Sequence, residues 1–222
     1  MLSTAFISLT VFVAVVAAAP QATSAAPLPL PTGGNDWISR VTPTVKLAGS
    51  PLDGQLINAV YGGFFIGRKT TIGPCADFAG CDTYSNITAI NFNQNKASGS
   101  MDIDAPGGQQ VYVAFAGQLA FTFPGDGPPS DGYANAFIRG EYFPPGESAY
   151  AAITFRGASW VACYTPDSGV YQVFAAAIAH KSSCIPFEMA ALENAPQTGQ
   201  RSTFQYATSP VPGTAPGCSA KA

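Results

Sequence analysis

Short runs in which apolar and polar side chains alternate, each ended by Gly, Pro, Asn, Asp or Ser, constrain the fold of this sequence most. In the clearest run, residues 118–123 (QLAFTF), the side chains of Leu119, Phe121 and Phe123 are expected to share one face. Alternation with a period of two is typical of half-buried β-strands. Similar runs lie at 41–47, 55–61, 63–67, 87–92, 99–104, 110–115, 134–140, 150–156, 159–164 and 170–176. The pattern predicts a single all-β, antiparallel domain of about 12 short strands.

The spacing of these runs also points to an architecture. Three candidate β-hairpins lie at 56–67, 111–122 and 160–175, two further strands separate each from the next, and a last strand is expected near 185–191. Three groups of four strands are the layout of a β-trefoil. We prefer it slightly to a β-sandwich, which uses the same short strands and turns. Residues 186–193 (PFEMAALE) have an alternative as one or two helical turns, because Met, Ala, Leu and Glu favour helix.

The composition allows a packed core and argues against a polyanionic partner. Hydrophobic side chains make up 47% of the 222 residues and charged ones only 10%, which excludes a charge-rich disordered chain. The 23 Gly and 19 Pro residues favour turns over long helices. With 10 basic and 13 acidic side chains the formal net charge is −3, so the sequence has no basic footprint for nucleic acid.

The first twenty residues indicate export from the cell. Residues 5–18 (AFISLTVFVAVVAA) form an apolar stretch that is shorter than the ~18–20 residues needed to span a membrane. Small residues stand where a signal peptidase cleaves. We therefore expect a signal peptide at 1–18, a Pro/Ala-rich linker at 19–35, the all-β domain at 36–206 and a disordered tail at 207–222. The expected location is secreted, either extracellular or in the cell wall, with no membrane partner.

Five cysteines fit an oxidising compartment, where bridged cysteines are more common than free ones. Proximity in the sequence favours the pairs Cys75–Cys81 and Cys163–Cys184 and leaves Cys218 in the Pro/Gly-rich tail. Both bridges are expected to staple loops. No C-x-x-C motif is present, so nothing in the spacing supports a redox motif or a paired-cysteine zinc site.

One sequence motif predicts a modification. Asn86 begins the sequon Asn86-Ile87-Thr88, in which the transferase recognises the hydroxyl of the threonine two residues on. Because the chain is expected to be secreted, we predict that Asn86 is glycosylated.

Few side chains could carry catalysis. The single histidine, His180, would have to be the base of any Ser-His-Asp arrangement, and a multi-histidine metal site is impossible. A glycosidase could use two of the four carboxylates that lie in Gly/Pro-rich turns, Asp126, Asp131, Glu141 and Glu147. A surface histidine and solvated carboxylates are the simpler interpretation. We therefore assign no catalytic, cofactor-binding or metal-binding residue.

The aromatic residues have two interpretations. The chain holds 15 Phe, 9 Tyr and 2 Trp residues, and those on alternating strand positions are expected in the core. Trp160, close to Cys163, is expected to pack there. Some of the others could instead form a face on which sugar rings stack.

Three blocks of sequence carry a family resemblance. The strongest block is 106–113 (PGGQQVYV), followed by 117–119 (GQL) and 121–122 (FT). The second block comprises Trp160, 162–163 (AC), 171–175 (YQVFA), Cys184 and Phe187. The third block comprises 49–51 (GSP), 65–67 (FIG) and the Cys75/Cys81 pair. Over roughly residues 47–206 these blocks resemble the phialide cell-wall proteins of filamentous fungi, the PhiA-type family, whose members are also labelled IgE-binding proteins. Residues 123–125 (FPG) replace the Gln and nearby His of the family, which marks a divergent member.

The resemblance implies a wall protein without known chemistry, and it transfers no catalytic residue. Together with the expected signal peptide and cysteines, it leads us to expect a secreted, non-enzymatic structural glycoprotein of a fungal cell wall or extracellular matrix, linked to conidiation in phialide and spore development. One alternative is a secreted carbohydrate-binding module that uses exposed Tyr and Trp faces. A secreted hydrolase ranks below it. No cofactor is implied, and the candidate partners are cell-wall polysaccharide and other wall proteins.

Overall fold

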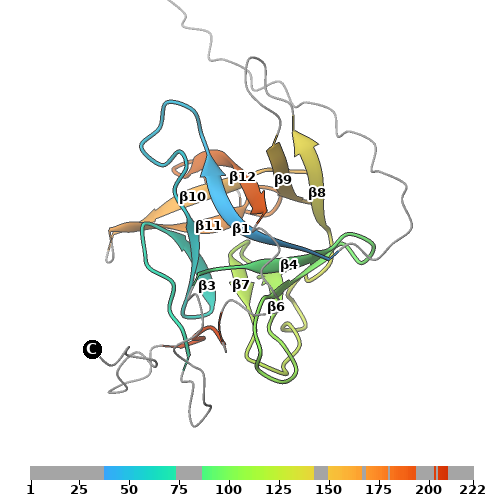
Figure 1. Cartoon of the computed structure of the whole chain (residues 1–222). Helices are drawn as coiled ribbons and strands as arrows, with labels where there is room; N and C mark the ends of the chain where they lie inside the picture. The colour runs from blue at the N-terminus through green and yellow to red at the C-terminus, as the bar shows by residue number, and fades with distance from the viewer. Residues whose placement is uncertain are drawn as a thin grey trace, which may run out of the picture.

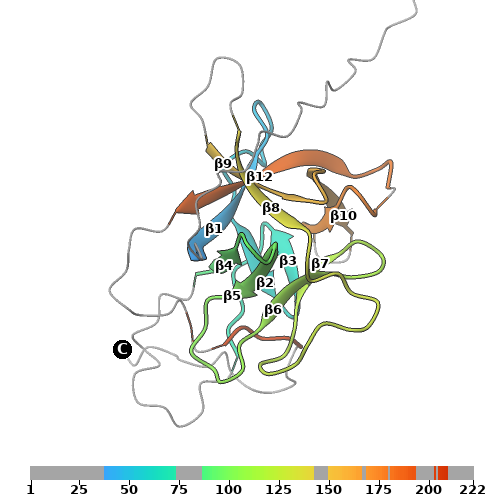
Figure 2. The same ribbon diagram turned by 90° about the vertical axis from the view of Figure 1, so that its right-hand side faces the viewer.

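The structure is a computed structural model that describes residues 38–73, 87–142, 150–166, 169–179, 181–193, 203 and 205–209. Within these residues the chain forms one antiparallel sheet and no helix (Figures 1 and 2). None of the described segments is therefore a helix long and apolar enough to cross a membrane. The strands are β1 (Ile38–Lys46), β2 (Ile57–Val60), β3 (Gly63–Ile66), β4 (Ile90–Asn93), β5 (Ser98–Met101), β6 (Gln110–Val113), β7 (Leu119–Phe121), β8 (Phe137–Tyr142), β9 (Tyr150–Phe155), β10 (Trp160–Thr165), β11 (Val170–Ala175) and β12 (Ile185–Glu193).

The sheet closes on itself. Its strands pair in the order β1–β4–β5–β6–β7–β3–β11–β10–β12, and β12 pairs again with β1. Strand β1 reaches both neighbours because its first part pairs with β4 and its later part with β12. Outside this ring, β2 pairs with β3, and the β8–β9 hairpin joins through β9 to β12. Closure pairs strand edges that would otherwise offer backbone groups to another chain.

The expected groups of strands are present. The three predicted hairpins are β2–β3, β6–β7 and β10–β11, and two strands lie between successive hairpins. Similar pairings recur along the chain: β1 pairs with β4, and β9 pairs with β12. The carbonyl of Ala97, just before β5, accepts the N–H groups of Ala136 and Phe137 at the start of β8. The all-β prediction is confirmed. The β-trefoil, preferred to the β-sandwich, stays a prediction.

The run at 118–123 departs from its expected pattern at both faces. Leu119 and Phe121 are buried as expected, but Phe123 is 55% exposed because β7 ends at Phe121. Thr122 ends the strand: its Oγ1 accepts the N–H of Gln110, and its hydroxyl donates to the carbonyl of Phe123. Every residue of β7 is buried, so the strand is covered on both faces and not half-buried.

The helical alternative for residues 186–193 is wrong, because this segment belongs to β12. Its residues pair with β1 over six positions and also with β10 and β9. Phe187, Met189 and Ala191 are buried, whereas Leu192 is 54% exposed. These partners decide the conformation, since tertiary pairing overrides the helix preference of Met, Ala and Leu.

Aromatic rings fill much of the interior. Trp160 is fully buried, as expected, and its indole Nε1 donates to the carbonyl of Ile153 at 2.7 Å. Its ring stacks on Phe137, with an interplanar angle of 18° and ring centroids 6.3 Å apart, and it also meets Phe155. The hydrogen bond satisfies the one polar atom of the indole, which lets Trp160 lie in the core at little cost.

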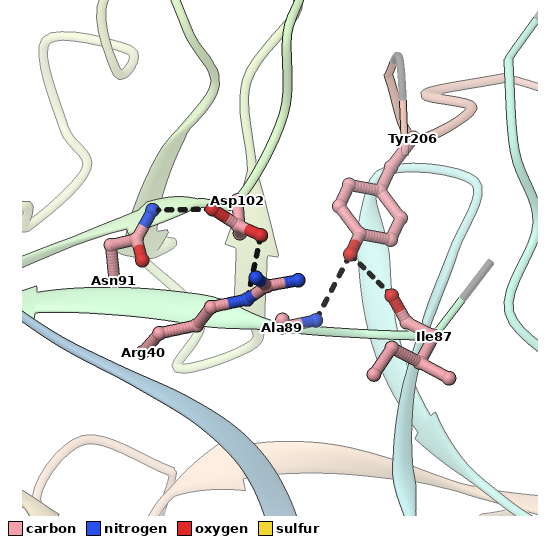
Figure 3. Close-up of polar contacts among 6 residues, drawn as sticks. All are labelled: Arg40, Ile87, Ala89, Asn91, Asp102 and Tyr206. Atoms are coloured by element: carbon pink, nitrogen blue, oxygen red, sulfur yellow. Dashed lines mark hydrogen bonds and ion pairs between the residues drawn. The ribbon is translucent and has the colours of Figure 1, made fainter. Parts of the chain in front are cut away.

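The segment near the C-terminus is tied into the same body. The hydroxyl of Tyr206 accepts the N–H of Ala89 and donates to the carbonyl of Ile87, at 2.9 and 2.6 Å (Figure 3). The next residue, Ala207, is buried; its carbonyl accepts the N–H of Gly62, and its N–H donates to the carbonyl of Thr71. These bonds join the last described residues to the chain that precedes β4 and to the β2–β3 hairpin.

Candidate functional site

The predicted Cys163–Cys184 disulfide is present, with the two Cα atoms 4.4 Å apart. It joins β10 to the segment before β12 and borders a small second cluster of buried apolar side chains that includes Phe174. The ammonium of Lys181 lies 4.0 Å from the centroid of the Phe174 ring. The bridge therefore staples a loop to the outer face of the sheet, as the sequence predicts.

Six other residues singled out from the sequence lie outside the described residues. They are Cys75, Cys81, Asn86, Glu147, His180 and Cys218. Their pairing, glycosylation and chemistry stay predictions.

The remaining candidate carboxylates are exposed. Asp126 and Asp131 lie between β7 and β8, and Glu141 lies in β8, not in a turn as its sequence context predicts. Glu141 is in a strand because it pairs with Ala151 of β9. Burial, and secondly the negative charge of Asp131, raise the pKa of Tyr112. The three carboxylates thus face solvent.

A groove of about 510 Å³, lined mainly by polar residues, lies over the outer faces of β4, β5 and β6. The three strands run side by side on one flank of the sheet (Figure 2). The groove follows from the alternation of side chains: in β4, Ile90 and Phe92 are buried, while Asn91 and Asn93 between and after them face outward. In β5, Gly99 and Met101 are likewise buried and the serines are half-exposed. Strand geometry therefore gathers the polar side chains on one face.

These side chains form two rows across the strands. Each row runs amide–hydroxyl–amide. In the first row Asn91 pairs with Ser100, which pairs with Gln110. In the second row Asn93 pairs with Ser98, which forms an isolated bridge with Asn135. All six residues line the groove. Strand register thus sets four amides and two hydroxyls in a regular array, which we call the amide rows.

An ion pair lies beside the first row, where Arg40 of β1 pairs with Asn91 of β4. Asp102 is fully buried, and its Oδ2 lies 2.8 Å from Nε of Arg40, while its Oδ1 accepts a hydrogen bond from Nδ2 of Asn91 at 3.1 Å (Figure 3). An ionised carboxylate can only accept, so the NH₂ end of the Asn91 amide must face Asp102. This contact orients the Asn91 side chain by a charge-assisted hydrogen bond.

A tight turn closes one end of the groove. The backbone N–H of Lys96 donates to Oδ1 of Asn93, and Ala97 adopts a φ of 49°, a left-handed conformation that lets the chain reverse between β4 and β5. Among the described residues that line the groove, Lys96 carries the only charge. The groove can therefore form many neutral hydrogen bonds and one interaction with an anion.

Sequence reasoning singled out none of the amide-row residues. The signal was nonetheless present in 90–101 (INFNQNKASGSM), where polar residues recur at every second position on both sides of a turn. Such a hairpin places its polar residues on one face. The contribution of Asn135 had no local signal, because it depends on a bridge across 37 residues of chain, from position 98 to position 135.

Comparison with known proteins identifies the family. No curated protein and no solved structure matches the chain significantly. The model of one family, described as PhiA-like secreted protein, matches residues 44–207, which is most of the chain and nearly the whole predicted domain. The match confirms the resemblance derived from the sequence blocks and the predicted secreted, extracellular or cell-wall location. This chain is a member of the PhiA-like secreted protein family.

Proposed function

We propose that this chain is a non-enzymatic structural glycoprotein of the fungal cell wall or extracellular matrix, where it contacts wall polysaccharide and supports conidiation. The observation that carries the proposal is the groove with its amide rows, which are formed by β4, β5, β6 and Asn135. Amides and hydroxyls both donate and accept hydrogen bonds, as the hydroxyl groups of a polysaccharide do. A secreted protein with such a face is suited to holding a hydroxyl-rich polymer.

The chemistry of the same groups supports a role without catalysis. The side chains of the amide rows neither gain nor lose a proton near neutral pH, so they cannot act as a general acid or base there. These groups bind and orient a polymer, and they leave its glycosidic bonds intact.

Cell fractionation tests the location and the developmental role together. We expect the chain in the wall fraction and the medium, with a mass that falls on treatment with an N-glycosidase, and at higher abundance in sporulating than in vegetative cultures. A cytosolic marker protein and a known wall protein serve as controls. Recovery only with the cytosolic marker would overturn the proposal, and equal abundance in both cultures would overturn the link to conidiation.

The second candidate, a dedicated carbohydrate-binding module, is favoured by the exposed aromatic rings. Trp160 cannot serve as a stacking platform because it is fully buried. Phe115 is 69% exposed, and Tyr61, Phe123 and Tyr164 are also exposed. Pull-down on purified glucan and chitin separates the candidates. Variants that remove these rings, such as Phe115→Ala and Tyr164→Ala, reduce retention if stacking supplies the affinity and leave it unchanged if the chain is held through the groove.

A further inference from the structure

We propose that the groove over β4, β5 and β6 is a binding site for a stretch of uncharged polysaccharide, which lies across the strands with its hydroxyl edges on the amide rows. This inference rests on the proposed function, because it takes the ligand to be a wall polymer. It goes further in assigning the site, the chemical class of the ligand and the direction in which the ligand runs.

The spacing of the rows supports this direction. Neighbouring strands of a sheet lie about 4.8 Å apart, which is close to the length of one hexose unit along an extended glycan. The first amide row supplies one polar side chain from each of β4, β5 and β6, namely Asn91, Ser100 and Gln110. The second row supplies Asn93 of β4, Ser98 of β5 and, beyond β5, Asn135 from the segment before β8. A glycan that crosses the three strands therefore meets a new hydrogen-bonding group at each successive sugar. A glycan parallel to the strands would lose this match.

The composition of the groove selects a neutral ligand. Four amides and two hydroxyls make up the rows, and Lys96 adds one positive charge at the end, next to the β4–β5 turn. A polymer with one acidic group per sugar would need a cation for each, and the described lining offers a single one. The described lining residues also include no aromatic ring, so the ligand is held by its hydroxyl edges and not by its ring faces.

The ion pair of Asp102 and Arg40 prepares the first row for binding. Since Asp102 accepts a hydrogen bond from the NH₂ group of the Asn91 amide, the carbonyl oxygen of that amide is directed to accept a hydrogen bond from a sugar hydroxyl. A side chain that is already oriented loses less conformational freedom when the ligand binds. Asp102 is thus a positioning residue for the groove.

Calorimetric titration of the full secreted chain tests the site. The probes are a hexasaccharide of β-linked glucose, a hexamer of N-acetylglucosamine and a hexamer of galacturonate. We expect at least one neutral probe to bind, with little dependence on salt. The variant Gln110→Ala/Asn135→Ala removes one exposed amide from each row and should weaken that binding about tenfold, since each lost hydrogen bond is a modest contribution. Ser183→Ala, an exposed polar residue outside the groove lining, is the matched control.

Three results would overturn the inference. They are unchanged affinity in Gln110→Ala/Asn135→Ala when its melting temperature equals that of the wild type, failure of both neutral probes to bind, and tighter, salt-sensitive binding of galacturonate. Ser100→Ala, in the middle of the first row, gives a second measurement and is expected to weaken binding without affecting the fold. If these variants bind normally while the wild type still fractionates with walls, the groove assignment fails and the proposed function stands; a wild type absent from walls removes the proposed function itself.

Discussion

Gln109 and Tyr206 are joined by two reciprocal hydrogen bonds: the N–H of Tyr206 donates to Oε1 of Gln109 at 2.8 Å, and Nε2 of Gln109 donates to the carbonyl of Tyr206 at 3.1 Å. The same Nε2 also donates to the carbonyl of Thr122 at 2.8 Å. Gln109 is fully buried, so a single side-chain amide replaces a strand partner for the segment near the C-terminus. It fastens residues that lie 97 positions apart.

Replacing Gln109 should therefore destabilise the domain strongly. Gln109→Ala leaves the N–H and carbonyl of Tyr206 and the carbonyl of Thr122 without this partner, and we expect a loss of about 3 kcal/mol in the free energy of unfolding. Denaturation by urea, followed by Trp fluorescence, measures it. Gln110→Ala, at the exposed neighbour, is the control and should stay within about 0.5 kcal/mol of the wild type. Equal effects of the two variants would contradict the role of Gln109.

Asp102 should matter for stability as well as for the groove. Asp102→Asn leaves the charge of Arg40 without its buried carboxylate, at a cost of about 3 kcal/mol. The double variant Arg40→Met/Asp102→Leu removes both charges and should recover much of the loss. Thermal unfolding compares them, with Asp126→Asn as an exposed control. If Asp102→Asn and Asp126→Asn melt alike, the ion pair does not stabilise the fold.

The disulfide should stabilise the domain by restricting the conformations of the unfolded chain. Cys163 and Cys184 are 21 residues apart, and cross-linking a loop of this size stabilises a domain by about 3 kcal/mol in the chain-entropy model. We expect Cys163→Ala/Cys184→Ala to unfold at a lower denaturant concentration under non-reducing conditions. Peptide mapping without reduction would confirm the bond in the wild type. An unchanged denaturation midpoint in the variant would show that the disulfide does not stabilise the domain.

Glu188 should make stability depend on pH. Burial raises the pKa of this β12 carboxyl, so the folded state favours its protonated form. The contribution of Glu188 to the free energy of unfolding is fully present below the pKa of its carboxyl in the unfolded chain, near 4.5. It is lost as the pH rises through the higher pKa of the same carboxyl in the folded state. Glu188→Gln should remove this decline. Urea midpoints measured from pH 4 to pH 7 test it, and parallel curves for variant and wild type would contradict it.

The strands could be predicted because alternation reports local geometry. The hairpins β2–β3, β6–β7 and β10–β11 each join two alternating runs across a short turn, so neighbouring residues contain the necessary information. The conformation of 186–193 could not be predicted in the same way. Its residues are ambiguous locally, and the pairing of β12 with β1, 146 residues away at Thr44 and Ala190, settles it.

The candidate site leaves a weaker signal in the sequence than the fold does. The polar residues of β4 and β5 were visible as an alternating pattern, but nothing local indicates that Asn135 joins Ser98 or that Asp102 is buried beside Arg40. Aspartate is ordinarily exposed, and only the ion pair makes its burial tolerable. Such tertiary relationships decide which polar side chains form a site, and they leave no trace in a window of a few residues.

The closing of the ring has a consequence for when this protein can fold. Strand β1 completes its pairing only with β12, so the N-terminal strand must wait until almost the entire domain has emerged from the ribosome. Contacts between such distant parts of a chain form slowly. In a secreted chain the closing of the ring and the Cys163–Cys184 bond therefore both come late, since the bond also waits for an oxidising compartment.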